Sequence, residues 1–447
     1  MTNSMPNPSA RKLAYQALYD VLEKGAYANI TLQHILKTYP LINEEVHLLT
    51  ELTYGVLRRY NYLIWIISRI SKVTVNKLHP SVRILICLGL YQLIYLTRIP
   101  ESAAVNECVK IAKKVTHRGN VGFINGILRN YLRKKEEIVM PGRENAPLLH
   151  DSLYWNEPEW LVQRWQKEFG KDLTTRIFDS FNEIPRFVIR VNTLKITADQ
   201  MIEKLEASHI AVQKSPFADD ALVITDGIHN IWKFVAEGLG YVQSISSMIP
   251  ARVLDPQPGE RILDMCAAPG SKTTQLAALM KNKGSIDAWD LYPHKISLLK
   301  KNAEKLGITI IHAGARDSSL PFPALKGVYD KVLLDAPCSG LGVLGHKLEI
   351  RWRRTAEGLD DFPPLQRKLL DCAADYVKRG GVLVYSTCTL NSSENEGQIS
   401  DFLKRHPDFH PSDFTLQGYR HSRNGMVTLL PFEMNSDGFF IARLEKE

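Results

Sequence analysis

Apolar residues recur at every third or fourth position through the first third of the chain, as Leu13, Leu18 and Val21 illustrate. This period is typical of amphipathic helices. The longest apolar run, residues 84–96, falls short of the ~20 residues that a membrane-spanning helix needs, so it predicts a buried core helix. Residues 1–140 are therefore predicted to form an all-α bundle.

A segment rich in Pro, Gly and Asn, residues 137–152, ends the helical pattern and predicts a linker. Beyond it, helical patterns lead into PRFVIRVNTLK (185–195), whose alternation predicts a strand, and then into a helix over 198–207. Residues 153–245 are therefore predicted to form a small α+β module.

From residue 246 onward, short apolar runs alternate with glycine turns and helical patterns. Each of these apolar runs leads to a carboxylate or a cysteine. They lie in ERILDMCAAPG, GSIDAWD, ITIIHAGARD, DKVLLDAPCSG and VLVYSTC. This alternation predicts a Rossmann-like, doubly wound α/β sheet over 246–447. Sheets of that kind bind their ligands at the carboxyl ends of the strands.

The positive charge of the chain is concentrated at its beginning. The 447 residues carry a net charge of +8, yet residues 1–140 hold 19 Lys and Arg against 9 Asp and Glu, and the remainder holds 37 against 39. A compact domain at +10 favours contact with a polyanion, because neutralised phosphates release their counterions. We therefore expect nucleic-acid contact in the helical part.

The composition excludes several classes of protein. Apolar residues make up 45% and charged residues 23%, which excludes a disordered, collagen-like or coiled-coil chain. Six cysteines without regular spacing argue against a disulfide scaffold, and the opening MTNSMPNPSA lacks the parts of a secretory signal. We expect a cytoplasmic protein with reduced thiols and no membrane association.

A loop of small residues, DMCAAPGSK (Asp264–Lys272), joins a predicted strand to a predicted helix. Its glycine spacing differs from that of the loops that bind nucleotide triphosphates, which disfavours nucleotide triphosphate hydrolysis. The free backbone amides at the start of the helix suit a ligand with a carboxylate. Asp290 ends the next strand, where it is placed to accept both hydroxyls of a ribose; a loop cap is the structural alternative for it. Asp317 at the third strand end strengthens the ligand-binding interpretation.

Two cysteines follow strands of the same predicted sheet. Cys338 lies in DAPCSG and Cys388 lies in YSTCT, each just beyond an apolar run. Cys87, Cys108 and Cys372 fall inside helical apolar patterns, where a thiol is usually a small inert core group. The spacing contains neither a CxxC pair nor an HxxH pair, so we expect no zinc site.

These motifs carry a resemblance to a known family. DMCAAPGSKT, DAPCSGLG, YSTCTLNSSENE and the closing DGFFIARL resemble the RNA 5-methylcytosine methyltransferases of the Sun or Fmu family, over residues 9–447. The helical part, with its segment FINGILRNYLR, resembles the NusB-type RNA-binding domain. The combination resembles the bacterial branch of the family that acts on 16S ribosomal RNA of the small subunit.

The resemblance implies S-adenosylmethionine as the methyl donor and ribosomal RNA as the partner. We expect a monomer without a metal ion. The implied donor site comprises Cys266, Ala267, Ala268, Pro269, Gly270, Ser271, Lys272, Asp290, Asp317 and Asp335.

The same resemblance implies that Cys388 is the nucleophile and that Cys338 helps to release the product. Carbon 5 of cytosine is too poor a nucleophile to take a methyl group directly. A thiolate that adds to carbon 6 makes an enamine-like intermediate whose carbon 5 is able to attack the methyl group. Asp335 is placed to stabilise the charge that builds on the base, and Lys272 to hold the donor's carboxylate or to polarise the base.

The chain departs from the family pattern at two points. Gly270-Ser271 replaces the usual pair of glycines, and GHKLEIRWRR (345–354) replaces a basic stretch with Pro-Asp. The second change affects the expected substrate and not the reaction type. In that stretch we expect Arg351, Arg353 and Arg354 to contact RNA phosphates, and Trp352 to be either a stacking platform or core.

Arg190 and Asn192, in RVNTLK, match a family motif that precedes the catalytic part. Two roles are open for them. They either orient the RNA or pack the domains together.

Three other functions compete with methylation of 16S ribosomal RNA. The same chemistry on another RNA, such as transfer RNA, is one. A non-catalytic ribosome assembly or antitermination factor is the second, although the intact Cys338, Cys388 and strand-end carboxylates argue against a decayed site. A DNA methyltransferase is the third, and it would use Cys338 as nucleophile and lack the Thr-Cys site.

Overall fold

The computed structural model describes residues 8–447. The first seven residues, which begin the stretch where we found no secretory signal, lie outside the described residues. The described chain forms two compact units. The helical unit runs to Asn182 and also contains His346–Ala356, and the sheet unit comprises Glu183–Gly345 and Glu357–Glu447.

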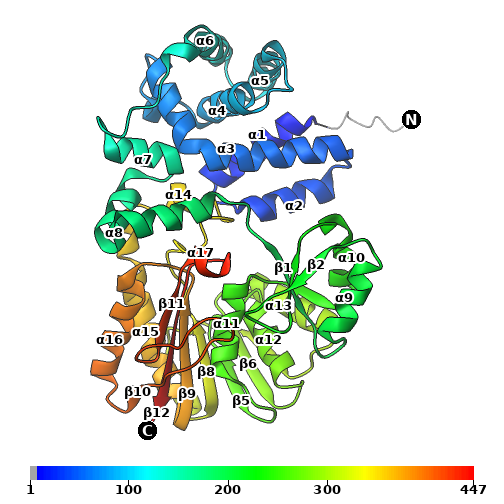
Figure 1. The fold of residues 1–447 in the computed structure, drawn as a ribbon, viewed down its shortest axis with the longest axis vertical. Helices are drawn as coiled ribbons and strands as arrows, with labels where there is room; N and C mark the ends of the chain where they lie inside the picture. Colours follow the sequence, from blue (N-terminus) through cyan, green and yellow to red (C-terminus); the bar gives the residue numbers. More distant parts are fainter. Residues whose placement is uncertain (1–7) are drawn as a thin grey trace. The chain divides into compact units, whose positions relative to one another are not determined.

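Helices are the only regular elements among the described residues of the helical unit, which confirms the predicted all-α bundle (Figure 1). The apolar run at residues 84–96 lies mostly in the helix that begins at Pro80. Its residues 84–92 are buried in the core of the unit as predicted, and residues 93–96 are partly buried against it. Within the described residues, no helix combines the length and the apolarity needed to cross a membrane. The helices are α1 (Ala10–Glu23), α2 (Ala28–Thr38), α3 (Asn43–Ile70), η1 (Val75–Lys77), α4 (Pro80–Tyr95), α5 (Glu101–Val115), α6 (Arg118–Lys134), η2 (Lys135–Glu137), α7 (Pro147–Trp155), α8 (Glu159–Asn182) and α14 (Ile350–Arg353).

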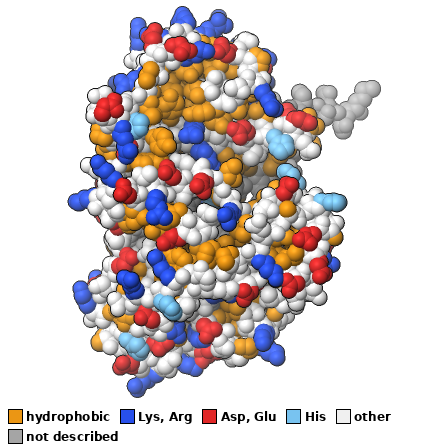
Figure 2. All heavy atoms as spheres, viewed as in Figure 1, with side chains coloured by type: hydrophobic (Ala, Val, Ile, Leu, Met, Phe, Trp, Pro, Cys, Tyr) orange, Lys and Arg blue, Asp and Glu red, His pale blue; other side chains and the backbone are white. Residues whose placement is uncertain are grey.

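The surface of the helical unit is mixed on the face that Figure 2 shows. Hydrophobic side chains gather over α4 to α6, and Lys and Arg side chains lie around them. The basic surplus of this part of the sequence is therefore not gathered into one patch on this face.

The segment His346–Ala356 supplies buried side chains to the helical unit. Arg351 Nε lies 2.9 Å from Glu157 Oε1, and both side chains are fully buried. Trp352 Nε1 donates to the Leu57 carbonyl at 3.2 Å, and Arg353 donates to the Val21 carbonyl at 2.9 Å.

These contacts correct the expectation for that segment. Arg351 is not available to RNA phosphates, because its guanidinium is fully buried against Glu157. The Arg353 guanidinium is bound to the carbonyls of Val21 and Ala26, so it also points away from the expected role. Trp352 is partly buried, bonded to the Leu57 carbonyl and packed against Tyr60, so the structure favours packing over a stacking platform. Arg354 is only partly buried, so its contact with RNA stays a prediction.

The sheet unit begins with a small antiparallel sheet of order β2-β3-β1-β4. The predicted strand in 185–195 and the predicted helix over 198–207 are both present. The elements of this α+β part are β1 (Phe187–Val191), α9 (Ala198–Glu206), β2 (Val212–Lys214), β3 (Ala221–Ile224), η3 (Ile228–Asn230), α10 (Trp232–Ala236) and β4 (Gly240–Val242).

The larger sheet has the order β10-β12-β9-β8-β5-β6-β7, with β11 paired to β12. Strands β5 to β9 pair with one another in parallel, and β12 adds to β9 in the antiparallel sense, which confirms the predicted Rossmann-like sheet. The strands are β5 (Arg261–Asp264), β6 (Ser285–Asp290), β7 (Ile311–Ala315), β8 (Tyr329–Asp335), β9 (Val377–Thr387), β10 (Phe409–Pro411), β11 (Met426–Leu429) and β12 (Phe439–Lys446).

Helices cover both faces of this sheet because successive side chains of its central strands are buried on opposite sides. Ile262 and Leu333 join a core with α11 and α12, whereas Leu263 and Leu334 join a core with α15 and α16 (Figure 1). The helices are α11 (Ile245–Leu254), α12 (Ser271–Leu279), α13 (Pro293–Leu306), η4 (Pro323–Leu325), η5 (Glu357–Leu359), α15 (Phe362–Tyr376), η6 (Ser392–Glu394), α16 (Glu396–Arg405) and α17 (Pro431–Met434).

Arg190 and Asn192 tie the two sheets of this unit together. Buried Arg190 donates to the side chain of Gln243 and to the Ser271 carbonyl, both at 2.6 Å. Asn192 Nδ2 donates to the carbonyls of Gly238 at 2.8 Å and Leu306 at 2.9 Å. Of the two roles that we left open, packing is the one that the structure shows.

Candidate active site

The loop after β5 has the backbone shape that its small residues predict. Gly270 has a φ of 101°, and a Cβ on it would lie 2.9 Å from Leu299 Cγ, so this position requires glycine. Ser271 is already the first residue of α12. The second glycine of the family pattern is therefore not needed here, and the amides of the α12 start remain directed at the loop.

A buried carboxylate, Asp264, lies behind this loop. Thr273 Oγ1 donates to its Oδ2 at 2.7 Å, and burial raises the pKa of Asp264 to about 7. The same region raises the pKa of the Cys266 thiol well above its ordinary value, through burial first and then through Asp264. Cys266 is thereby kept protonated, which suits a wall of the loop and not a nucleophile.

Asp290 and Asp317 lie at the ends of neighbouring strands, as the sequence predicts. Asp290 Oδ1 accepts the backbone N–H of Tyr292 at 3.1 Å and lies 3.8 Å from Lys295 Nζ. Asp317 Oδ1 accepts the Ser319 hydroxyl at 2.7 Å and its amide at 3.0 Å, and these bonds lower the pKa of Asp317. Both carboxylates are held in place by their own loops.

Asp335 and Lys272 form an ion pair between β8 and α12. Lys272 Nζ donates to Asp335 Oδ2 at 2.7 Å and to Ser247 Oγ at 3.1 Å. Ser386 Oγ, on the adjacent strand β9, donates to Asp335 Oδ1 at 2.8 Å. The lysine is 9% exposed and the aspartate 27%, so the carboxylate remains accessible while its orientation is fixed.

The two strand-end cysteines meet. Cys338 Sγ and Cys388 Sγ are 3.3 Å apart, and both residues are partly exposed. The hydrogen bond to Cys388, followed by burial, raises the pKa of Cys338 well above that of a free thiol. The parallel pairing of β8 with β9 brings them together, because Asp335 lies opposite Ser386 in that register.

The other cysteines are structural, as the sequence predicts. Cys87 and Cys108 are fully buried in the helical core, and burial raises the pKa of each thiol to about 12. Cys372 is buried in α15. Residues 8–447 contain no group of three or more His, Cys, Asp or Glu side chains arranged to hold a metal ion.

Sequence reasoning missed several residues of the site. Ser386 and Glu394 lie within a quoted motif, but their side chains gave no sign of their partners. Ser247 is 25 residues from Lys272 and stands outside every motif, so no sequence signal was available for it.

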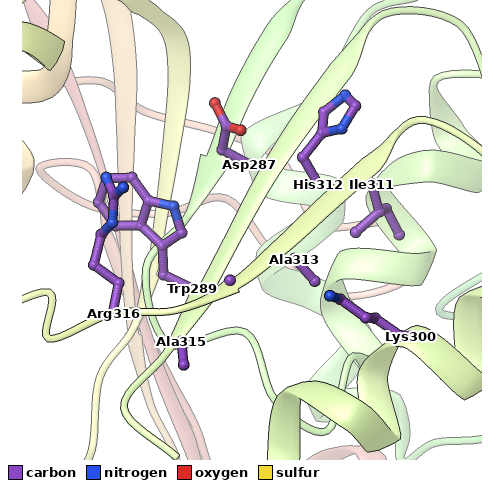
Figure 3. A pocket seen from close by; sticks show the side chains of 9 residues that line it. Asp287, Trp289, Lys300, Ile311, His312, Ala313, Ala315 and Arg316 are labelled. Atoms are coloured by element: carbon purple, nitrogen blue, oxygen red, sulfur yellow. The ribbon is translucent and has the colours of Figure 1, made fainter. Parts of the chain in front are cut away.

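A pocket of about 520 Å³ lies along β6 and β7, at the β7 edge of the sheet (Figure 3). Its lining includes Trp289, Lys300 and His312 but neither cysteine. Arg316 covers the Trp289 ring at 4.6 Å and directly precedes Asp317. The lining contains no residue of the proposed donor site either, so the pocket is not assigned to the candidate site.

Three family models match the chain, and together they cover most of it. The 16S rRNA methyltransferase RsmB/F model matches residues 251–445, and the NusB family model matches residues 8–133. The RsmF/B-like ferredoxin-like domain matches residues 157–229.

Relatives match over almost the whole chain. A probable ribosomal RNA small subunit methyltransferase B of Bacillus subtilis is 36% identical over 99% of this chain and 100% of its own length. The ribosomal RNA small subunit methyltransferase B of Serratia proteamaculans is 32% identical over 98% and 99%.

Solved structures agree with this assignment. The crystal structure of a protein designated PH0851 superposes with a TM-score of 0.84 at 30% identity, over 99% of both chains. The structure of NSun6 from Pyrococcus horikoshii with SFG has a TM-score of 0.57 at 25% identity, over 65% of this chain and 98% of that one. The chain belongs to the RsmB/F family of 16S ribosomal RNA methyltransferases.

Proposed function

We propose that the protein transfers a methyl group from S-adenosylmethionine to carbon 5 of a cytosine in 16S ribosomal RNA, through a covalent bond between Cys388 and carbon 6. One observation carries this proposal: Cys338 and Cys388 are in contact beside the ion pair of Asp335 and Lys272. A direct transfer to an oxygen or an amine needs no thiol. An addition followed by an elimination uses one thiol to attack and a second group to remove a proton.

The residues around the β5 loop fit a donor that carries both a carboxylate and a positive charge. Among the residues that the structure describes, Asp264 Oδ1 is a buried oxygen without a hydrogen-bond partner, which suits a cationic ligand. In this proposal the loop Cys266–Lys272 and the start of α12 hold the donor's carboxylate end, and Asp290 and Asp317 hold its nucleoside end. The SFG in the relative from Pyrococcus horikoshii, an analogue of the donor, supports this choice.

Bond formation begins at Cys388. Its thiolate adds to carbon 6 of the cytosine, and carbon 5 becomes electron-rich. Asp335 holds the ring nitrogen or the exocyclic amine while charge builds on the base, and Lys272 and Ser386 keep Asp335 in that orientation. The donor, when bound, supplies an electrophilic methyl group on a positively charged sulfur.

Release requires a base for the proton of carbon 5, and Cys338 in its thiolate form accepts it as Cys388 leaves. The contact between the sulfurs explains why proton removal by Cys338 follows the attack of Cys388. Its hydrogen bond to Cys388 is the largest cause of the raised pKa of Cys338. Once Cys388 is bonded to carbon 6, that hydrogen bond is gone and the pKa of Cys338 falls. A larger fraction of Cys338 is then thiolate, which is the form that accepts the proton of carbon 5.

The helical unit contributes RNA affinity in this proposal, and the protein works as a monomer in the cytoplasm. The surplus of +10 in residues 1–140 supports this role. Exposed Lys113, Lys114 and Arg118 lie between the end of α5 and the start of α6 and offer phosphate contacts. Each contact that is lost should lower the slope of log affinity against log salt by about 0.7–0.9.

The test is to map the product. The full-length protein is incubated with the methyl donor and with 16S ribosomal RNA or transfer RNA, and bisulfite sequencing then locates methylated cytosines. We expect protected cytosine in 16S ribosomal RNA and none in transfer RNA. Protection confined to transfer RNA would overturn the substrate. Methyl transfer without any protected cytosine would overturn the position on the base.

A further inference from the structure

A buried carboxylate lies behind the two cysteine loops. Glu394, the last residue of η6, is fully buried. Its Oε2 accepts the backbone N–H of Ser339 at 2.8 Å and the side-chain amide of Gln366 at 3.0 Å. Its Oε1 accepts the side-chain amide of Asn391 at 2.8 Å. Every bond that it makes here is with a donor, which suits an acceptor-only group.

Those donors belong to the segments that carry the cysteines. Ser339 directly follows Cys338, and Asn391 lies three residues after Cys388. Gln366, on α15, donates from the same nitrogen to the Pro337 carbonyl at 3.0 Å. The carboxylate therefore holds the backbone on both sides of Cys338, directly through Ser339 and indirectly through Gln366.

Further hydrogen bonds join the two loops beside the carboxylate. Ser339 Oγ and Thr389 Oγ1, the hydroxyls that follow the two cysteines, are 2.7 Å apart. Asn395 accepts the Thr387 hydroxyl at 2.6 Å and donates to the Thr389 carbonyl at 3.0 Å. Cys388 is thus fixed from both sides as well, and Glu394 and its neighbour Asn395 supply the ties.

We propose that Glu394 is a positioning residue for the two thiols: its buried carboxylate fixes the Cys338 loop against the Cys388 loop, so that the sulfurs meet and divide their roles. This inference rests on the two-cysteine mechanism proposed above. Nothing in it requires Glu394 to touch RNA or donor.

The charge of Glu394 acts in the same direction as its geometry. It contributes, after the hydrogen bond, burial and the charge of Cys388, to the raised pKa of Cys338. The charge of Glu394 therefore favours the protonated form of Cys338 in the free protein, which is the state that the proposed roles require before Cys388 attacks.

The test compares Glu394→Gln with Glu396→Gln, an exposed residue two positions away on α16. Iodoacetamide labelling, read by peptide mass spectrometry over a range of pH, measures the ratio of Cys388 to Cys338 modification without RNA or donor. We expect Glu394→Gln to reduce this ratio by about tenfold, the effect of one pKa unit, and to slow methyl transfer by about a hundredfold. Glu396→Gln should match the wild type in both.

A folded Glu394→Gln protein with the wild-type ratio and rate would overturn the proposal. A second variant keeps the test open should that one not fold. Gln366→Met removes the bond to the Pro337 carbonyl and the bond to Glu394 but leaves the charge, so transfer should fall by about tenfold while the labelling ratio is kept. Wild-type transfer in this variant would overturn the positioning role.

The labelling ratio also separates this inference from the proposed function. If the wild-type protein fails to methylate cytosine, the proposed function is wrong. The ratio of the two thiols still reports whether Glu394 divides their roles.

Discussion

Each unit of the molecule contains an ion pair of similar length in a very different setting. Arg351 and Glu157 of the helical unit are 2.9 Å apart and 0% exposed. Lys272 and Asp335 of the sheet unit are 2.7 Å apart, with the aspartate 27% exposed and also bound by Ser386. The first pair has no access to a ligand and supports the fold, whereas the second keeps an accessible carboxylate and belongs to the proposed active site.

The comparison teaches that the type of residue does not identify a functional charge. A buried pair loses its hydration, and removing one partner leaves the other charge uncompensated. Burial raises the pKa of Glu157 to about 7 even though Arg351 lowers it. A pair at a strand end keeps contact with solvent and is able to exchange a partner for a substrate group. Substitutions in the two pairs should therefore damage different properties.

The largest expected effect is on stability. Glu157→Ala leaves Arg351 buried without its partner and should lower the free energy of unfolding by about 3–5 kcal/mol. Urea denaturation measures it, and Glu107→Ala, which breaks the exposed pair with Lys110, should change stability by less than about 1 kcal/mol. Equal stability of the two variants would contradict the structural role of the buried pair.

The second effect is on chemistry. Asp335→Asn keeps the shape of the side chain but removes its charge, and it should slow methyl transfer by about a hundredfold to a thousandfold, or about 2.7–4 kcal/mol. Single-turnover assays with labelled donor measure the rate, and denaturation should show a change in stability smaller than that of Glu157→Ala. If Asp335→Asn kept the wild-type rate, or lost as much stability as Glu157→Ala, the two pairs would not differ in role and the comparison would be contradicted.

The third effect is on donor affinity. Asp290→Ala removes the proposed bonds to the ribose hydroxyls, and charge-assisted hydrogen bonds are worth about 1.5–3 kcal/mol. Calorimetry with S-adenosylmethionine should show this loss, whereas Glu157→Ala, in the other unit, should bind the donor normally. Unchanged affinity in folded Asp290→Ala would reduce Asp290 to a cap for its own loop, the role that its bond to Tyr292 describes.

The fourth effect concerns pH and, at about 1.4 kcal/mol per pH unit, is the smallest in any single step of its measurement. Burial raises the pKa of Asp264 to about 7, above the value of about 3.9 for an unfolded chain. The folded protein holds this proton more tightly, so the stabilisation is complete below about pH 4 and is lost as the pH rises through about 7. Compared with Asp264→Asn, the wild type should lose up to about 1.4 kcal/mol per pH unit in that window. If the unfolding midpoints of the wild type and of Asp264→Asn changed equally with pH, this pKa shift would be contradicted.

The sequence predicts the catalytic part better than the segment next to it, for a physical reason. Residues that follow parallel strands must meet at one edge of the sheet, so the strand pattern predicted where Asp290, Asp335, Cys338 and Cys388 lie, while their roles stay a proposal. No such constraint acts on 345–354, where composition alone suggested phosphate contacts. Only the tertiary structure shows that Arg351 and Arg353 point into the helical unit.

Supporting contacts also escaped the sequence. Ser247 reaches Lys272 from another helix, and Glu394 binds a backbone amide 55 residues away. Such pairs depend on which loops the fold brings together. The periodicity of hydrophobic residues along the chain therefore does not predict these contacts.

The central claim is that the two cysteines have separate roles, and trapping of the covalent adduct tests it most directly. Labelled 16S ribosomal RNA is incubated with donor and each full-length variant, and denaturing gels report RNA that remains attached to protein. Cys388→Ala should form no adduct and no product, because no thiolate attacks carbon 6. Cys338→Ala should attack and then release slowly, leaving trapped RNA. A trapped adduct in Cys388→Ala, with none in Cys338→Ala, would contradict the account.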